Sequence, residues 1–314
     1  MTKTVMGLRV EPAMTDNLRK YLGDETEAFL SKLEPCLEKY TKLWRLSQLT
    51  FMPTDTVNLL FSCESEVYGS CVLKVCIPGP EVATEINCLR AYSGQGYVKL
   101  WDYDLVDNML LLERIMPGDQ MWAVKDYRKR AQLMADLIKD LPFIECEVGE
   151  YPTYRIQMEG LCKNLISMGG MEEPLSYLDK AVLVYDELKR KYQRKCLLHG
   201  DMHQENMLLD SNGSYTVIDP KGVVDDPVME TARFLMNEVD TPNNKDMLLE
   251  MVSIMAPIIG IPEADMLKSM YVDAALGGCW CLENHFPTQE AFEKEKQEIL
   301  ETCGFVYGLL SEKS

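Results

Sequence analysis

The sequence predicts an α+β chain with two lobes, a small one built on an antiparallel sheet and a larger one that is mainly helical. Short β-type runs, separated by turn residues, gather between residues 43 and 115. Helical spacing of apolar residues dominates after Pro117, and only the stretch 196–226 interrupts it. We therefore expect a first lobe at 1–116 and a second lobe at 117–314.

Composition narrows the class of protein before any motif is considered. The 314 residues are 46% hydrophobic and 26% charged, which is ordinary for a folded chain with a substantial core. We find no run of about 18 uncharged apolar residues, as a membrane span needs, and no apolar signal-peptide region at the start. The eleven cysteines include no CxxC pair, so we expect reduced thiols and a cytoplasmic protein.

The acidic balance of the chain bears on its partners. A formal net charge of -18 argues against nucleic acid and against anionic membranes, because both need a basic face. The charge suits a cationic partner, but many acidic surfaces merely aid solubility. The sequence predicts no particular oligomeric state.

The elements of the small lobe follow from the same patterns. A helical segment precedes the first strand, three short β-type runs come next, and a helix and a hairpin complete the lobe. Their residues are 16–42 for the leading segment, 44–52, 56–64 and 70–77 for the strands, 81–92 for the helix, and 97–105 with 108–115 for the hairpin.

The most informative stretch is HGDMHQEN at 199–206, followed by the apolar run YTVI and then Asp219. It supplies a carboxylate at Asp201 to orient a substrate hydroxyl, and an amide oxygen at Asn206 for a hard cation. Asp219 adds a second carboxylate for the same cation. Phosphoryl transfer with magnesium needs such a set. Any one of these residues could simply cap a turn, but the set in this order favours catalysis.

HGDMHQEN and the later IDPKG together resemble the aminoglycoside phosphotransferase family within the protein-kinase-like fold, and its streptomycin and hydroxyurea kinase branch in particular. The resemblance runs from about residue 43 to 285. It implies a bilobal kinase that uses ATP and Mg²⁺. It also implies that Asp201 is the catalytic base, that Asn206 and Asp219 are magnesium ligands, and that His199 is a structural member of the catalytic loop.

A lysine and a glutamate in the small lobe test this interpretation independently. Lys74 is the only charge in the run CVLKVCI, and such a lysine is rarely left unpaired. In the next helix, Glu85 falls on the same face as the apolar stripe of Val82, Ile86 and Leu89. Both charges should point inward and pair. In the family such a pair orients ATP, whereas a purely structural salt bridge is the alternative.

Two further nucleotide contacts are expected in the small lobe. The chain has neither GxxxxGK[ST] nor GxGxxG, which excludes an ordinary P-loop or Rossmann site. Thr54, Thr56 and Asn58 occupy the turn between the first two strands and could contact phosphates, although an ordinary turn fits nearly as well. Glu113 and Ile115 close the hairpin where kinases place their adenine-binding hinge, in which backbone groups read the base.

His199 and His203 lie four residues apart, but the HExxH zinc motif needs a glutamate at position 200, where this chain has glycine. His203 is instead expected to orient the loop or the substrate.

The residues that would bind the acceptor are less clearly defined by the sequence. The acidic residues that closely follow Asp219 are candidates, although some of them will only cap helices. An aromatic residue and an acid at the end of a later helix are candidates too, because that stretch resembles a W-x-x-E/D segment near the acceptor site of this branch. The candidates are Asp225, Glu230, Trp280 and Glu283.

These residues together predict a small-molecule kinase that transfers the γ-phosphoryl of ATP to a hydroxyl group, with an aminoglycoside-type acceptor favoured. A protein substrate is disfavoured, because Pro220 replaces the Phe of DFG and no APE segment is present. A metabolite kinase of the choline, sugar or homoserine type keeps the chemistry and changes the acceptor. A nucleotide-binding pseudokinase is the alternative from another class of protein.

Overall fold

A computed structural model describes residues 4–5, 8–9, 12–53, 58–147, 149, 151–240 and 243–310. The chain forms two compact units. Unit 1 holds residues 1–115 with 284–286, and unit 2 holds 116–283 with 287–314. The units divide after Ile115, and residues 284–286 belong to unit 1, whereas we expected a division after Met116 and a single lobe at 117–314.

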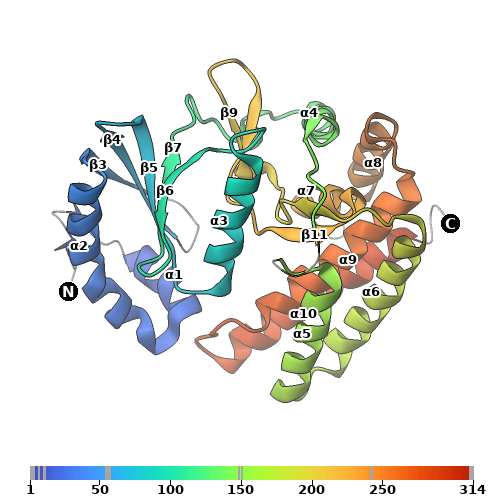
Figure 1. Cartoon of the computed structure of the whole chain (residues 1–314). Coiled ribbons are helices and arrows are strands. Elements are labelled where there is room, and N and C mark those ends of the chain that lie inside the picture. Colours follow the sequence, from blue (N-terminus) through green and yellow to red (C-terminus); the bar gives the residue numbers. More distant parts are fainter. Residues whose placement is uncertain are drawn as a thin grey trace. The chain divides into compact units, whose positions relative to one another are not determined.

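Unit 1 is built on a five-stranded antiparallel sheet with strand order β3-β4-β5-β7-β6 (Figure 1). The strands are β3 (Leu46–Met52), β4 (Leu59–Ser65), β5 (Gly69–Val75), β6 (Leu100–Asp104) and β7 (Met109–Glu113). Its helices are α1 (Pro12–Leu22), the 3₁₀ turn η1 (Gly23–Glu25), α2 (Thr26–Leu43) and α3 (Pro80–Tyr92), and β1 (Thr4–Val5) pairs with β2 (Leu8–Arg9). The leading segment at 16–42, expected to form one or two helices, thus belongs to two.

The two faces of the sheet have different roles because strand side chains alternate. Cys71, Leu73 and Val75 of β5 point to one face and join the buried cluster that α2 supplies with Leu33 and Leu37. This burial of apolar surface is the main force that holds α2 on the sheet. Residue 74 must then point to the opposite face, on the side of α3.

Unit 2 is mainly helical. Its helices are α4 (Tyr127–Asp140), α5 (Tyr154–Met168), α6 (Glu172–Lys191), α7 (Ala232–Met236), α8 (Lys245–Ile259), α9 (Glu263–Cys281) and α10 (Gln289–Leu310). Two strand pairs interrupt them, β8 (Cys196–Leu198) with β11 (Val223–Asp225) and β9 (Met207–Leu209) with β10 (Tyr215–Val217). The 3₁₀ turns are η2 (Met121–Ala123), η3 (Gln204–Asn206) and η4 (Pro227–Thr231). The central helix is α9, which packs against α6, α7 and α10.

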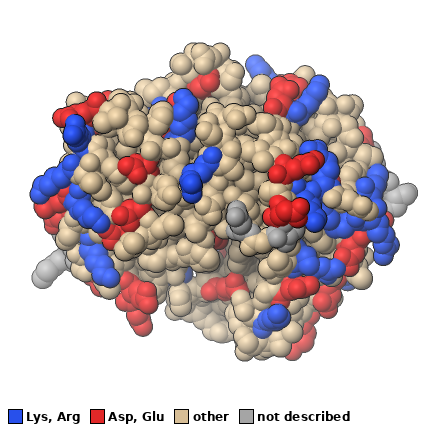
Figure 2. All heavy atoms as spheres, in the orientation of Figure 1, with Lys and Arg blue, Asp and Glu red and all other residues tan. Residues whose placement is uncertain are grey.

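Acidic and basic side chains are intermingled on the face shown in Figure 2. Within the described residues, no single helix has both the length and the apolar character to cross a membrane. The α8 and α9 pair passes that test together, by length and composition only, and is bent by 115°.

Candidate active site

Residues 199–206, named the catalytic loop here after the role expected from the sequence, leave the buried strand β8 and end at β9. It turns at Gly200, where φ is 76° and an added Cβ would lie 2.7 Å from Cγ2 of Val223 on β11. Only glycine meets both requirements without strain. The turn brings Asp201 to the surface of the loop with 23% of its side chain exposed.

His199 is fully buried and holds this loop together as a neutral imidazole. Its Nε2 lies 2.7 Å from the carbonyl oxygen of Ile218, and its Nδ1 accepts the N–H of Asp201 at 3.2 Å. These two bonds need a proton on Nε2 and none on Nδ1. Burial lowers the pKa of His199 to about 4, so the ring stays neutral near pH 7. A structural role of His199 in this loop stays a prediction, and these two bonds support it.

A pH dependence of stability follows from His199. The unfolded chain binds a proton below about pH 6.5 and the folded chain only below about 4, so the free energy of unfolding falls as pH drops through that window. The histidine should contribute on the order of 2 to 3 kcal/mol to that fall. Urea unfolding of the parent and His199→Asn from pH 4 to 7.5 measures it. A free-energy difference between the two that stays constant over this range would contradict the assignment.

Glu230 supports the same loop from η4. Only 2% of the residue is exposed, and its carboxylate accepts the backbone N–H groups of His199 at 2.7 Å and Gly200 at 3.0 Å. Burial raises the pKa of Glu230 to about 7, although these two bonds favour the ionised form. This corrects the expectation that Glu230 contacts the acceptor, because both oxygens already hold the loop.

Asp225 is also corrected from an acceptor contact to a structural residue. It is 2% exposed, and its carboxylate accepts from the Tyr185 hydroxyl at 2.6 Å and from Lys189 Nζ at 2.7 Å. It therefore ties β11 to α6. The next residue, Asp226, caps η4 by accepting the N–H of Val228, the role that acidic residues often take at helix starts.

Asn206 and Asp219 are brought close together by a backbone bond, since the N–H of Ile218 donates to the carbonyl of Asn206 at 2.9 Å. The Asn206 amide nitrogen donates to the Asp201 carbonyl at 3.0 Å and lies 3.1 Å from His203 Nε2. This fixes the amide, and its oxygen is the group that a cation would bind. Asp219 has φ of 59°, a left-handed conformation that aspartate tolerates.

This donor set fits magnesium. The ligands would be an amide oxygen and a carboxylate, which are the hard donors that Mg²⁺ prefers. Across the described part of the chain, no group of three or more His, Cys, Asp or Glu could hold a metal. Mg²⁺ needs no such group, because it usually takes one or two protein ligands together with substrate phosphates.

His203 is the second histidine of the loop, and its Nδ1 lies 2.9 Å from the Glu205 carboxylate.

Two site residues were missed by the sequence analysis. Arg233 Nε of α7 lies 3.4 Å from Asp201 Oδ1 and 3.3 Å from Asp273 Oδ2 of α9. Asp273, and after it Asp201, raise the pKa of Arg233, so the guanidinium stays charged. Burial raises the pKa of Asp273, with Arg233 opposing that shift. The sequence did contain a pattern that could have predicted them. Each is the only charged residue in an apolar helical run, and the same pattern predicted that Lys74 is buried and paired.

Unit 1 contains the predicted ion pair. Lys74 Nζ lies 2.7 Å from Glu85 Oε1, and their side chains are 4% and 7% exposed. The pair forms because β5 points Lys74 away from the α2 face while the buried side of α3 presents Glu85. The competing lysine, Lys99, is 47% exposed.

The other predicted nucleotide contacts of unit 1 have varied surroundings. Thr54 and Thr56 lie outside the described residues. Asn58 accepts the N–H of Ile77 at 3.2 Å through its side chain, which joins the start of β4 to the end of β5. Glu113 ends β7 and pairs with Lys99 at 3.5 Å, and Ile115 is the last residue before the division of the units.

The two remaining acceptor candidates lie at the end of α9 and just after it. The Trp280 ring is partly exposed, with Lys221 Nζ 5.8 Å from its centroid. Glu283 accepts from the side-chain amide of Asn164 at 2.6 Å. Both are accessible, unlike Asp225 and Glu230.

A family model described as aminoglycoside/hydroxyurea antibiotic resistance kinase matches residues 44–285. The chain belongs to this family. Streptomycin 6-kinase of Streptomyces griseus is 23% identical to it over 223 residues, 70% of this chain and 72% of that protein. Hydroxyurea phosphotransferase of Kitasatospora aureofaciens is 28% identical over 182 residues, 52% of this chain and 49% of that protein. For that second relative, the match spans about half of its length.

Solved structures agree on the fold of this kinase. Choline kinase LicA from Streptococcus pneumoniae superposes with a TM-score of 0.60 at 13% identity, covering 87% of this chain and 99% of that one. The protein-kinase-like fold is therefore confirmed. Membership of the family makes the chain an ATP-dependent phosphotransferase that acts on a hydroxyl group of a small molecule.

Proposed function

We propose that this kinase transfers the γ-phosphoryl of ATP to a hydroxyl of a small cationic acceptor of the aminoglycoside type, with Asp201 as the base. The observation that carries the proposal is the catalytic loop. His199 and Glu230 hold its backbone while Asp201 stays accessible, and Asn206 lies beside Asp219. A loop so fixed can present a base and one cation ligand without rearrangement, and Asp219 would supply the second ligand from the segment after β10.

Asp201 would accept or direct the proton of the acceptor hydroxyl as its oxygen attacks the γ-phosphorus, and the bond to the ADP oxygen breaks. Asn206 and Asp219 would hold Mg²⁺. When bound, this ion neutralises the charge that develops on the phosphates. In unit 1, Lys74 would bind the phosphates of ATP, and Glu85 would hold the ammonium group in place.

The adenine base would be read by backbone groups at Glu113, the last residue of the β7 strand, and at Ile115, which lies two residues further on. Thr54 and Thr56 are proposed as phosphate contacts from the sequence alone. Asn58 joins β4 to β5, so its proposed contribution is to hold the turn that carries them. On the acceptor side, Trp280 offers an exposed ring face and Glu283 an accessible carboxylate, which suit an ammonium or guanidinium group.

The cationic acceptor predicts a salt dependence. Turnover would be followed by coupled nucleotide consumption with streptomycin, choline, hydroxyurea and glucose as acceptors. The KM of a cationic acceptor should rise severalfold between ~0.05 M and ~0.3 M salt, because screening shortens the range of exposed charge pairs. The KM for glucose or hydroxyurea should stay nearly constant.

If a neutral acceptor has the highest kcat/KM, and its KM does not change with salt, the proposal of a cationic acceptor is rejected. That result would leave the phosphotransferase activity intact and favour the metabolite-kinase alternative. Absence of ADP formation with every acceptor, together with absence of nucleotide binding, would reject the proposed use of ATP itself.

A further inference from the structure

Gln204 is the first residue of η3, the short turn that ends in the proposed cation ligand Asn206. Its side chain is polar and yet fully buried. The amide nitrogen donates to Glu238 Oε1 at 2.8 Å and to the carbonyl oxygen of Phe234 at 3.2 Å, and the amide oxygen accepts from Asn237 Nδ2 at 2.9 Å. The amide therefore uses both of its N–H groups and its oxygen.

These partners fix the orientation of the Gln204 amide. A half-turn about its last bond would place the amide oxygen against two acceptors, the Glu238 carboxylate and the Phe234 carbonyl. Buried acceptors that face each other without a donor are costly. The side chain is thus held in one position, and the start of η3 is held with it.

The carboxylate that binds Gln204 is itself fixed by Arg130 of α4. Arg130 Nε donates to Glu238 Oε1 at 2.8 Å, and Nη2 donates to Oε2 at 2.6 Å. Arg130 Nη1 donates to the carbonyl oxygens of Val124 and Lys125 at 2.7 and 3.2 Å. Two parallel bonds fix both the distance and the angle of such a pair. Desolvation offsets much of the attraction in a buried pair, so its presence is weak evidence for a role in stability alone.

Arg130 also reaches the other side of η3, through Trp122 of η2. Its guanidinium lies over the Trp122 ring, 4.8 Å from the centroid. Trp122 Nε1 donates to Oε1 of Glu205, the middle residue of η3, at 3.2 Å. Both residues that precede Asn206 in η3 are therefore connected to the same guanidinium.

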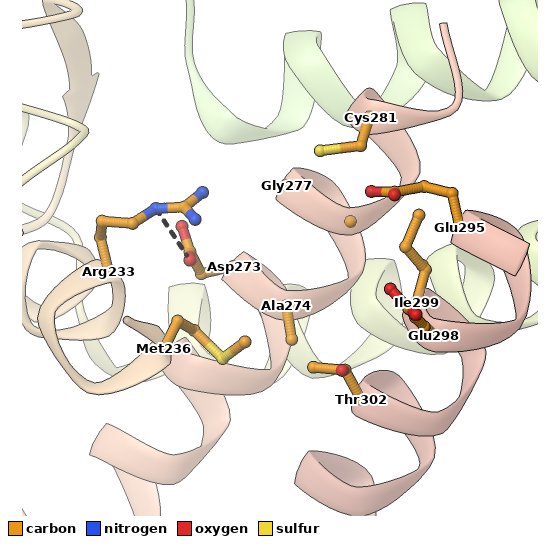
Figure 3. A pocket seen from close by; sticks show the side chains of 11 residues that line it. Arg233, Met236, Asp273, Ala274, Gly277, Cys281, Glu295, Glu298, Ile299 and Thr302 are labelled. Atoms are coloured by element: carbon orange, nitrogen blue, oxygen red, sulfur yellow. Dashed lines mark ion pairs between the residues drawn. The ribbon is translucent and has the colours of Figure 1, made fainter. Parts of the chain in front are cut away.

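The short helix α7 supports the catalytic loop at both of its ends. Near its start, Arg233 lies 3.4 Å from the proposed base, Asp201, and 3.3 Å from Asp273 on α9 (Figure 3). The two residues directly after its end bind Gln204. The base and the part of the loop that carries the cation ligand thus have separate supports.

We propose that Arg130, Glu238 and Gln204 form a positioning unit that holds η3 and thereby sets the place of Asn206. The inference rests on the proposed function, which makes Asn206 a ligand of Mg²⁺, and adds to it three residues that act through the loop. Groups that orient a metal ligand commonly account for about ten- to a hundredfold in metal affinity or activity. A misplacement of about 1 Å can cost about a hundredfold in rate.

Gln204→Met tests the unit, because methionine has a similar length and shape but lacks the amide. The pair of Arg130 and Glu238 stays intact in this variant, whereas the three amide bonds are lost. The variant should need about tenfold more Mg²⁺ than the parent for half-maximal ATP affinity. Calorimetric titration of ATP at a series of Mg²⁺ concentrations measures this requirement, and no acceptor is needed.

Tyr271→Phe is the matched control for a loss of stability alone. It removes a hydrogen bond of another fully buried side chain in unit 2, from the Tyr271 hydroxyl to the carbonyl oxygen of Tyr177 at 3.0 Å. Both variants should unfold at lower urea concentration than the parent, but only Gln204→Met should change the Mg²⁺ requirement. A destabilised Gln204→Met that keeps the Mg²⁺ requirement of the parent would overturn the proposal.

Hydrogen exchange of the protein without nucleotide and metal measures the hold on η3 directly. In Gln204→Met, the amides of residues 204–209 should exchange about fivefold faster or more, because the bonds that hold the turn are lost. The amides of residues 196–201, where Glu230 accepts two backbone N–H groups, should keep the rate of the parent.

Asn237→Ala is a second variant that does not put folding at risk, because Asn237 is exposed. It removes one of the three bonds to Gln204, so exchange of residues 204–209 should rise by a smaller factor, about two- to threefold. Parent rates of exchange in both variants would overturn the support of η3.

Asn206→Ala separates this proposal from the function on which it rests. If it raises the Mg²⁺ requirement as Gln204→Met does, the unit acts through the cation ligand as proposed. If Asn206→Ala binds ATP with the Mg²⁺ requirement of the parent, the assignment of Asn206 in the proposed function falls. Faster exchange of residues 204–209 in Gln204→Met would then still uphold the support of η3.

Discussion

Asp201→Asn should keep its affinity for nucleotide and lose at least about a hundredfold in turnover, the usual scale for removing general base help. Asparagine keeps the shape of the side chain but cannot take the hydroxyl proton. Calorimetric titration of ATP and initial rates with streptomycin measure the two effects separately. Asp246→Asn, an exposed change on α8, is the control for a change of charge alone.

Asp219→Asn should produce a different defect, because this residue is assigned to the cation and not to the acceptor. Its nucleotide affinity should lose much of its dependence on magnesium, whereas that of Asp201→Asn should keep it. The assignment of Asp201 fails if Asp201→Asn transfers phosphate at the parent rate. The assignment of Asp219 fails if its nucleotide binding responds to magnesium as the parent does.

Lys74→Met should lower kcat/KM for ATP by about ten- to a hundredfold, since a charged hydrogen bond to phosphate is worth roughly 1.5–3 kcal/mol. Glu85→Gln should give a milder loss, because the lysine remains but is no longer held 2.7 Å from a carboxylate. The double variant should be little worse than Lys74→Met, as expected for residues that act as one unit.

The stability of these variants needs its own measurement. Lys74→Met leaves the buried Glu85 carboxylate without its lysine and should lower the free energy of unfolding by about 3–5 kcal/mol. The exposed Lys99 and Glu113 pair in the same unit, at 3.5 Å, is the matched control, and its removal should cost little. Fully additive losses in kcat/KM for Lys74→Met and Glu85→Gln would mean that the pair does not act as a unit.

The sheet and the inward-facing pair of unit 1 were predictable from the sequence. Alternation along β5 separates residues 71, 73 and 75 from residue 74, and the helical period puts Glu85 beside Ile86 on the buried stripe. A charge in such a pattern must find a partner, and the partner lies only eleven residues away. The local periodicity of the strand and of the helix was therefore enough to predict this pair.

The supports of the catalytic loop were harder to predict. Glu230 bonds to backbone atoms thirty-one residues earlier, and spacing alone does not tell a buried acid from one at a binding surface. Arg233 and Asp273 are forty residues apart and meet only because α7 packs on α9. Long-range contacts of this kind depend on helix packing, which a single sequence does not encode in a local pattern. Asp225 and Glu230 were mistaken for acceptor contacts for the same reason.

Phosphoryl transfer from ATP to an acceptor hydroxyl is the central claim, and product stoichiometry tests it most directly. The parent kinase would be incubated with ATP, Mg²⁺ and streptomycin, and ADP and phosphorylated acceptor would be quantified together by mass spectrometry. We predict equal amounts of ADP and of an acceptor phosphate ester, with both nearly absent in Asp201→Asn. ADP formed without any phosphorylated acceptor, or acceptor phosphorylated equally well by Asp201→Asn, would contradict the account.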